Sequence, residues 1–201
     1  SYRPSIDNLP ARDAGQLDGA PTVDDSFTLS VDDKVVRVQL TSTVNKCDFH
    51  AGDHLDPDGV GIVRYPHEIE PAAALESCLA AVAAAPQVAR FHYQLGRAYT
   101  ALRDLENAQV AFEKARELGH DRAYYALGAN ALGRIQEVSG RRSELAPLDV
   151  LGFYAAGAQR GDPYAMNGLG RQYLLYSDDP NRQEEGYLLF LEECLTATIK
   201  E

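Results

Sequence analysis

The chain has 201 residues and a mass of 22.0 kDa, enough for one hydrophobic core of ordinary size or a short stack of repeats. Its formal net charge is −11, so nucleic acids and anionic membrane surfaces, which require a cationic face, are not expected partners. Hydrophobic residues make up 45% of the chain and no run of 18 apolar residues occurs, so we expect neither wholesale disorder nor membrane insertion.

The N-terminal third of the sequence contains two segments of different character. Residues 1–25 combine five aspartates with prolines and glycines and few large apolar groups, which predicts a flexible acidic arm. Residues 26–69 are expected to form a hairpin and loop region, because apolar and polar residues alternate on both sides of Asp32–Asp33. The alternating apolar residues are Phe27, Leu29, Val31, Val36, Val38 and Leu40. A lone hairpin is marginally stable in water, so we expect it to pack on the body of the protein or on a neighbour.

From residue 70 onward the hydrophobic period becomes helical. Pro71 suits the first position of a helix, and Leu75, Cys78, Leu79 and Val82 then form one apolar stripe. Further helices are predicted over residues 88–102, 105–118, 121–135, 147–160, 163–175 and 181–198. Residues 70–201 are therefore predicted to form a helical domain of antiparallel pairs.

A Leu-Gly dipeptide recurs in the middle of three predicted helices. The pairs are Leu95-Gly96, Leu127-Gly128 and Leu169-Gly170, at spacings of 32 and 42 residues. Residues 89–119 also match the tetratricopeptide offsets, through Leu95, Gly96, Tyr99, Ala108, Phe112 and Ala115. Small residues at such offsets allow two helices to approach closely, and the aromatic residues fill the wedge between adjacent pairs. The alternative is an unrelated helical bundle in which the Leu-Gly pairs recur by chance.

Residues 153–170 closely resemble the Sel1-like repeat, a relative of the tetratricopeptide repeat with a somewhat longer unit. The shared features are an aromatic pair before alanine-rich helix residues, a Gly-Asp turn at Gly161-Asp162, and the Leu-Gly pair at Leu169. The likeness covers about residues 70–198, and the spacing of 42 implies an insertion at Gln136–Pro147. It implies a mainly α fold, an α-α superhelix, in a scaffold that binds proteins or peptides and carries out no chemistry.

Arginine and tyrosine recur at the positions that would line the inner side of such a superhelix. The candidate partner-binding residues are Arg90, Tyr93, Arg97, Arg122, Tyr125, Asn167 and Arg171. Guanidinium groups pair with carboxylates, and tyrosine and asparagine bond peptide backbone, so we expect a groove for an acidic or carboxylate-bearing segment. The acidic arm of the chain itself is a second candidate occupant. Solvated helix faces with local ion pairs remain the alternative.

No pattern in the sequence indicates catalysis or a cofactor. No nucleophile motif, Walker-type loop or dinucleotide fingerprint occurs, so we expect the chain not to be an enzyme. His50, Asp53, His54, Asp56 and Asp58 could offer metal ligands, but their spacing does not fit an EF-hand. We therefore expect a polar loop with Asx turns and no metal at this segment.

Cys47 and Cys78 are candidates for a disulfide, which would attach the hairpin region to the first predicted helix. Two reduced thiols in the core are the alternative. The segment between these cysteines also resembles the one that precedes Sel1-like repeats in bacterial proteins with an N-terminal caspase-like peptidase domain.

That second resemblance implies an alternative function, a non-catalytic regulatory or substrate-docking module of a larger hydrolase. It favours a periplasmic or secreted location over a cytoplasmic one without fixing it. Because the chain starts at Ser1 rather than Met, we expect either a processed end or a piece of a longer protein.

Overall fold

The structure, a computed structural model, describes residues 22–31, 34–139 and 146–199, and it is mainly helical. Two strands come first, β1 (Thr22–Val31) and β2 (Lys34–Thr43). The helices that follow are α1 (Lys46–Ala51), the short 3-10 helix η2 (Pro66–Glu68), α2 (Pro71–Ala84), α3 (Ala89–Ala101), α4 (Leu105–Glu117), α5 (Arg122–Ser139), α6 (Leu148–Ala158), α7 (Pro163–Tyr176) and α8 (Pro180–Ile199). Each helix predicted from residue 71 onward is present, and α5 differs most because it continues past residue 135 to Ser139.

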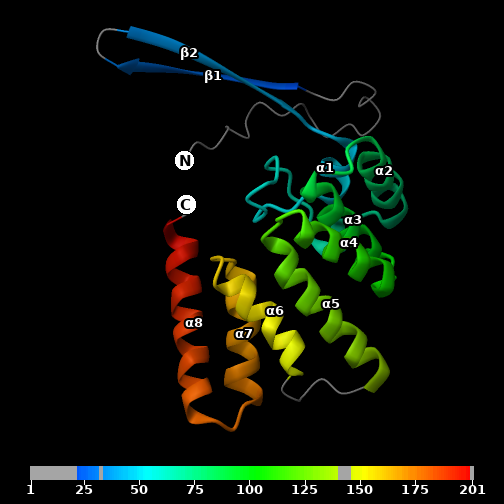
Figure 1. The fold of residues 1–201 in the computed structure, drawn as a ribbon, viewed down its shortest axis with the longest axis vertical. Coiled ribbons are helices and arrows are strands. Elements are labelled where there is room, and N and C mark those ends of the chain that lie inside the picture. The colour runs from blue at the N-terminus through cyan, green and yellow to red at the C-terminus, as the bar shows by residue number, and fades with distance from the viewer. Residues whose placement is uncertain (1–21, 32–33, 140–145, 200–201) are drawn as a thin grey trace.

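The two strands form an antiparallel sheet in which Phe27 is opposite Val38 and Leu29 is opposite Val36. Among the described elements, neither strand contacts a helix, and Figure 1 shows the strands extending away from the helical body. The strand β1 begins at Thr22, so the last residues of the predicted arm belong to it. The rest of that arm, residues 1–21, and the turn at residues 32–33 lie outside the described part of the chain.

The contacts between helices arrange them in two rows. Each helix from α1 to α8 packs against the next one along the chain, and α1, α3, α5 and α7 also contact one another in succession. These four helices therefore form one row, and α2, α4, α6 and α8 form the other. We use the name inner row for α3, α5 and α7, because α1 belongs to the segment that packs over them. The pair of α1 and α2 adds a short helix that sequence periodicity did not predict.

A buried leucine and a glycine stand at the same place in three inner helices. Leu95, Leu127 and Leu169 are 7%, 0% and 3% exposed, and each lies in a separate cluster of buried apolar residues. A Cβ atom on the glycine that follows would lie 2.4 Å from the Phe112 ring for Gly96 and 2.7 Å from the Tyr154 ring for Gly128. These glycines are thus required because an aromatic ring of the next helix occupies the space.

The apolar stripe predicted for α2 is correct only in part. Cys78 is fully buried with Ala74 and Ala81, but Leu79 is 45% exposed. Because α2 is apolar on nearly every face, periodicity could not identify the buried one. Small residues at Ala74 and Ala81 allow the close approach of α1 and α3, and this rotates Leu79 outward.

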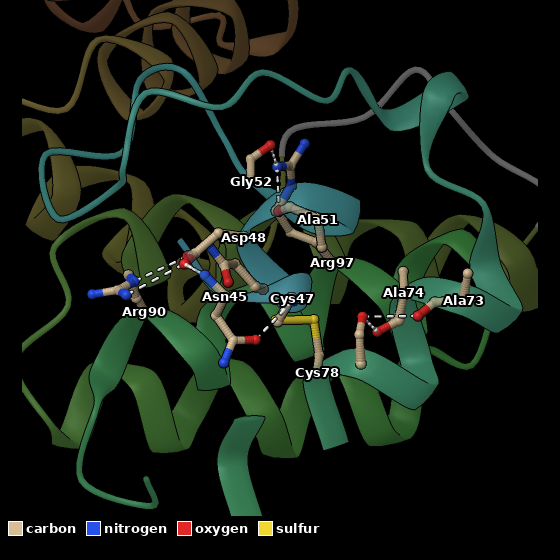
Figure 2. The surroundings of a disulfide bond; sticks show 12 residues. Asn45, Cys47, Asp48, Ala51, Gly52, Ala73, Ala74, Cys78, Arg90 and Arg97 are labelled. Carbon is tan, nitrogen blue, oxygen red and sulfur yellow. Dashed lines mark hydrogen bonds and ion pairs between the residues drawn. A yellow bond between two sulfur atoms is a disulfide. The ribbon is translucent and has the colours of Figure 1, made fainter. Parts of the chain in front are cut away.

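The sulfur atoms of Cys47 and Cys78 lie 2.02 Å apart, which is the distance of a disulfide bond (Figure 2). Both side chains are fully buried, and they join α1 to α2 across 31 residues of sequence. The bond closes the loop that contains residues 52–69, so that this segment is held at both ends.

Gly96→Ala should destabilise the protein by about 1–3 kcal/mol, because the new methyl group would overlap the Phe112 ring. The measurement is urea unfolding followed by circular dichroism. Gly152→Ala is the matched control, since its Cβ would meet nothing within 4 Å, and it should stabilise α6 by about 0.5–1 kcal/mol. Equal effects of the two substitutions would contradict the packing described here.

Counting thiols in denaturant without reductant should give one free thiol from the three cysteines, and reduction should raise the count to three. Replacing Cys47 and Cys78 together by alanine should lower the free energy of unfolding by about 3–4 kcal/mol, because the open loop gains conformational entropy in the unfolded state. Three free thiols before reduction would show that the bond is absent.

Candidate functional site

The inner face of the first helix pairs is covered by the chain itself, through residues 44–69, which we call the covering segment. It starts with α1, whose Asn45 accepts a hydrogen bond from the backbone N–H of Cys47 while Asp48 accepts one from that of Asn45. This reciprocal cap stabilises a helix of only six residues. Past Gly52 the segment continues without regular structure to η2, and it carries three buried carboxylates toward α3 and α5.

Asp48 is fully buried, and two side chains of α3 donate hydrogen bonds to its carboxylate. The Nε atom of Arg90 donates to it at 3.0 Å, and the side-chain amide of Gln94 donates at 2.9 Å. Figure 2 shows Arg90 reaching the Asp48 carboxylate beside the disulfide. A buried carboxylate without such partners would cost several kcal/mol, so this pair fixes α1 against α3.

Asp53 lies at the centre of a second buried network. The hydroxyl of Tyr93 donates to it at 2.7 Å, and Arg122 donates to it at 2.7 Å with Nη2. The other terminal nitrogen of Arg122 lies 3.0 Å from both oxygens of Asp162, which also accepts from the backbone N–H of Ala165 at the start of α7. One guanidinium thus connects the covering segment with α5 and α7.

The electrostatics of this network favour its charged form. Burial alone would raise the pKa of Asp53, but the positive charges of Arg122 and Arg97 and the hydrogen bond from Tyr93 lower it to about 2. Burial raises the pKa of Tyr93 well above its usual value. Burial by itself would lower the pKa of Arg122, and its acidic neighbours raise it overall.

Arg97 binds backbone rather than a carboxylate. Its guanidinium donates to the carbonyl oxygens of Ala51, at 2.8 Å, and of Gly52, while its second terminal nitrogen donates to the carbonyl oxygen of Arg64. These three carbonyls belong to the two ends of the loop in the covering segment. A single arginine therefore holds that loop in place through main-chain acceptors.

The aspartates considered as metal ligands, Asp53, Asp56 and Asp58, have different hydrogen-bond partners. Asp53 and Asp56 accept backbone hydrogen bonds two residues ahead, as expected for Asx turns. Asp56 also lies 3.1 Å from Nε2 of His120, a fully buried ring that stacks on Tyr93 at a centroid distance of 4.6 Å. Asp58 is 4.0 Å from the same nitrogen. This contact of His120 with Asp56 connects the turn before α5 to the covering segment.

Two adjoining cavities lie along the inner row, and the covering segment lines the larger one. The larger has a volume of about 620 Å³ and lies between residues 53–69, α3 and α5, and the smaller, about 450 Å³, lies between α5 and α7. They share Tyr125, Gln136 and Tyr164, so together they form one groove. The charged residues that line the groove are Arg64, Arg97, Arg103, Arg122, Arg171, Asp53 and Glu137. Arginines exceed carboxylates there, in a chain whose net charge is −11.

The candidate partner-binding residues fall into two groups. Arg90, Tyr93, Arg97 and Arg122 all bond to the covering segment, so their partner is internal. Tyr125, Asn167 and Arg171 line the smaller cavity. Arg171 is exposed and forms no hydrogen bond or ion pair with any residue that the structure describes.

Four residues of these networks were not predicted from the sequence. They are Asp48, its partner Gln94, His120 as the partner of Asp56, and Asp162 as a partner of Arg122. The capping pattern of Asn45 and Asp48 was a signal for α1 that could have been used. Nothing local indicates the pairing of Asp56 with His120, because the two are 64 residues apart.

Searches against protein-family models, curated proteins and solved structures give no match to this chain. Within the described ranges, no helix combines the length and the apolar character needed to cross a bilayer. The function is therefore inferred from the geometry of the groove and from the residues that line it.

Asp53 should make unfolding dependent on pH in the acid range. Its pKa is about 2 in the folded chain and 3.8 in the reference state, so its stabilisation is present above pH 4 and is lost as the pH falls toward 2. The difference corresponds to about 2 kcal/mol. Urea unfolding between pH 6 and pH 2 should show a smaller loss of the free energy of unfolding for Asp53→Asn than for wild type. Asp178→Asn, which changes an exposed aspartate, should show the same loss as wild type. Parallel curves for wild type and Asp53→Asn would contradict the network.

Proposed function

We propose that this chain is an α-α superhelix of Sel1-like repeats that binds an acidic or carboxylate-bearing segment of a protein partner along its inner row. The expected binding residues are those of the open groove, Tyr125, Asn167 and Arg171, with Tyr164 at its centre. The proposal concerns binding alone and assigns no chemistry to the groove.

The helix packing supports the repeat interpretation. Gly96 and Gly128 each face a ring of the next helix, and the Cβ position of Gly170 lies 3.4 Å from the Phe190 ring. The chain turns with a left-handed glycine after α4 and α6, at Gly119 with φ of 91° and Gly161 with φ of 79°. Contacts between helix pairs that repeat in this way are characteristic of solenoid proteins.

The observation that carries the proposal is the covering segment. Residues of the inner row already bind an acidic stretch of the same chain, in which the carboxylates of Asp48 and Asp53 are matched by Arg90 and Arg122. The inner row then continues past this stretch into an open groove with Arg171 and three tyrosines. Similar chemistry along one continuous face favours an acidic segment as the occupant of the open part.

The groove also has the size and polarity of a binding site. Cavities of about 300–1,000 Å³ with apolar and aromatic walls and a few polar groups are typical of ligand sites. Tyr125 and Tyr164 lie 5.3 Å apart between ring centroids and form the wall that the two cavities share. Tyrosines of this kind provide large contact areas with little loss of side-chain entropy.

The test is a selection of random decapeptides on the immobilised full chain, followed by fluorescence anisotropy with synthetic forms of the selected peptides. Selected peptides should be enriched in Asp and Glu, and replacing these by Asn and Gln should weaken binding about tenfold or more. Arg171→Glu should weaken binding by a similar factor, through loss of an attractive charge and gain of a repulsive one.

Arg134→Glu is the matched control, because Arg134 is an exposed arginine of α5 that lines neither cavity. It should leave the affinity within about twofold of wild type. Selection of neutral or basic peptides, or equal effects of the two substitutions, would contradict the proposed function.

A further inference from the structure

The contacts that Arg97 makes with the covering segment indicate which acceptor atoms Arg171 binds, because the two arginines occupy corresponding positions on their helices. Arg97 follows Gly96 in α3, and Arg171 follows Gly170 in α7. Gly96 faces the Phe112 ring of α4, and Gly170 faces the Gly186 carbonyl oxygen and the Phe190 ring of α8. Because each glycine faces the helix that follows, the two arginines have a similar rotational position on their helices. Each also lines one of the two cavities that make up the groove.

The two arginines differ in what covers them. Arg97 is half-buried under residues 51–64 and donates to three main-chain carbonyl oxygens. Arg171 is exposed at the wall of the smaller cavity, and within the described residues nothing accepts a hydrogen bond from it. An arginine thus stands at the same place in two helices, once with its acceptors in place and once without one among the described residues.

The neighbouring inner-row positions support this correspondence. Tyr93 and Asn167 each stand four residues before the arginine of their helix, and Tyr93 donates its hydroxyl to the Asp53 carboxylate. A polar side chain therefore stands one helical turn before the arginine in both helices.

We propose that Arg171 binds main-chain carbonyl oxygens of a looped, acidic segment from a partner chain, as Arg97 binds the carbonyls of Ala51, Gly52 and Arg64 at the two ends of its loop. A terminal carboxylate is not needed in this mode, so an internal segment of the partner can be the ligand. The inference rests on the proposed function and specifies which acceptor atoms of the ligand the groove binds.

The probe is a synthetic peptide of residues 51–64, acetylated and amidated at its ends and labelled with fluorescein. In wild type the Arg97 position is occupied by the tethered copy of this segment, which leaves the Arg171 position for the peptide. Fluorescence anisotropy with the full chain should show saturable binding. Arg171→Ala should weaken it about tenfold or more, in line with the loss of charged hydrogen bonds, and Arg134→Ala should not change it.

Two further variants separate charge from geometry. Arg171→Lys keeps the charge but loses the planar fork, so it should restore only a minor part of the affinity. In the peptide, an ester in place of the amide that joins Gly52 and Asp53 makes the Gly52 carbonyl a weaker acceptor, so it should weaken binding several-fold. Circular dichroism and thermal unfolding establish that the Arg171 variants remain folded.

The inference is overturned if the capped peptide does not bind, if Arg171→Ala leaves its affinity unchanged, or if the ester binds as well as the amide. It is also overturned if only the peptide with a free C-terminal carboxylate binds, because Arg171 would then bind the carboxylate rather than main-chain carbonyls. None of these results decides the proposed function, which fails separately if the selected decapeptides are not acidic.

Discussion

Burial of two carboxylates determines how the first half of this molecule is assembled. Asp48 and Asp53 belong to a segment with little regular structure, and an unpaired carboxylate at either place would cost several kcal/mol. The segment can therefore occupy only the position where Arg90 and Arg122 meet these groups. Since Arg122 also bonds to Asp162 at the start of α7, the same requirement aligns the covering segment with three inner helices. Removal of one partner from such a pair typically costs about 3–5 kcal/mol.

A disulfide and a set of close helix contacts complete this assembly. Cys47 and Cys78 join α1 to α2, where neither helix has the ring-against-glycine contact of the later pairs. A covalent link is an effective substitute there because α1 has only six residues and buries little apolar surface of its own. The covering segment is thus fixed covalently at one end, by buried ion pairs along its length and by Arg97 at its loop. The inner row consequently has a filled part and an open part.

Helical periodicity was enough to predict the helices from residue 71 onward, and the Leu-Gly pairs indicated the close approaches at Gly96 and Gly128, because both signals depend on residues near in sequence. The same spacing placed Arg90, Arg97 and Arg122 on one face. The occupant of that face could not be predicted, because its contacts with α3 and α5 join residues 33 to 69 positions apart. The short helix α1 was missed because six residues contain too little periodicity. The buried stripe predicted for α2 was partly wrong because that helix is apolar on nearly every face.

The charge distribution determines at which distances an acidic ligand is repelled by the chain or attracted to this groove. The chain carries a net charge of −11, whereas the residues lining the groove include more arginines than carboxylates. At long range an acidic partner is therefore repelled, and attraction begins only at separations comparable to the Debye length, about 8 Å at physiological ionic strength. Added salt screens the long-range repulsion as well as the exposed contacts, so the two effects of salt oppose each other. Contacts to main-chain carbonyls, such as those of Arg97, are suited to this situation because they depend on short-range geometry more than on the charge of the ligand.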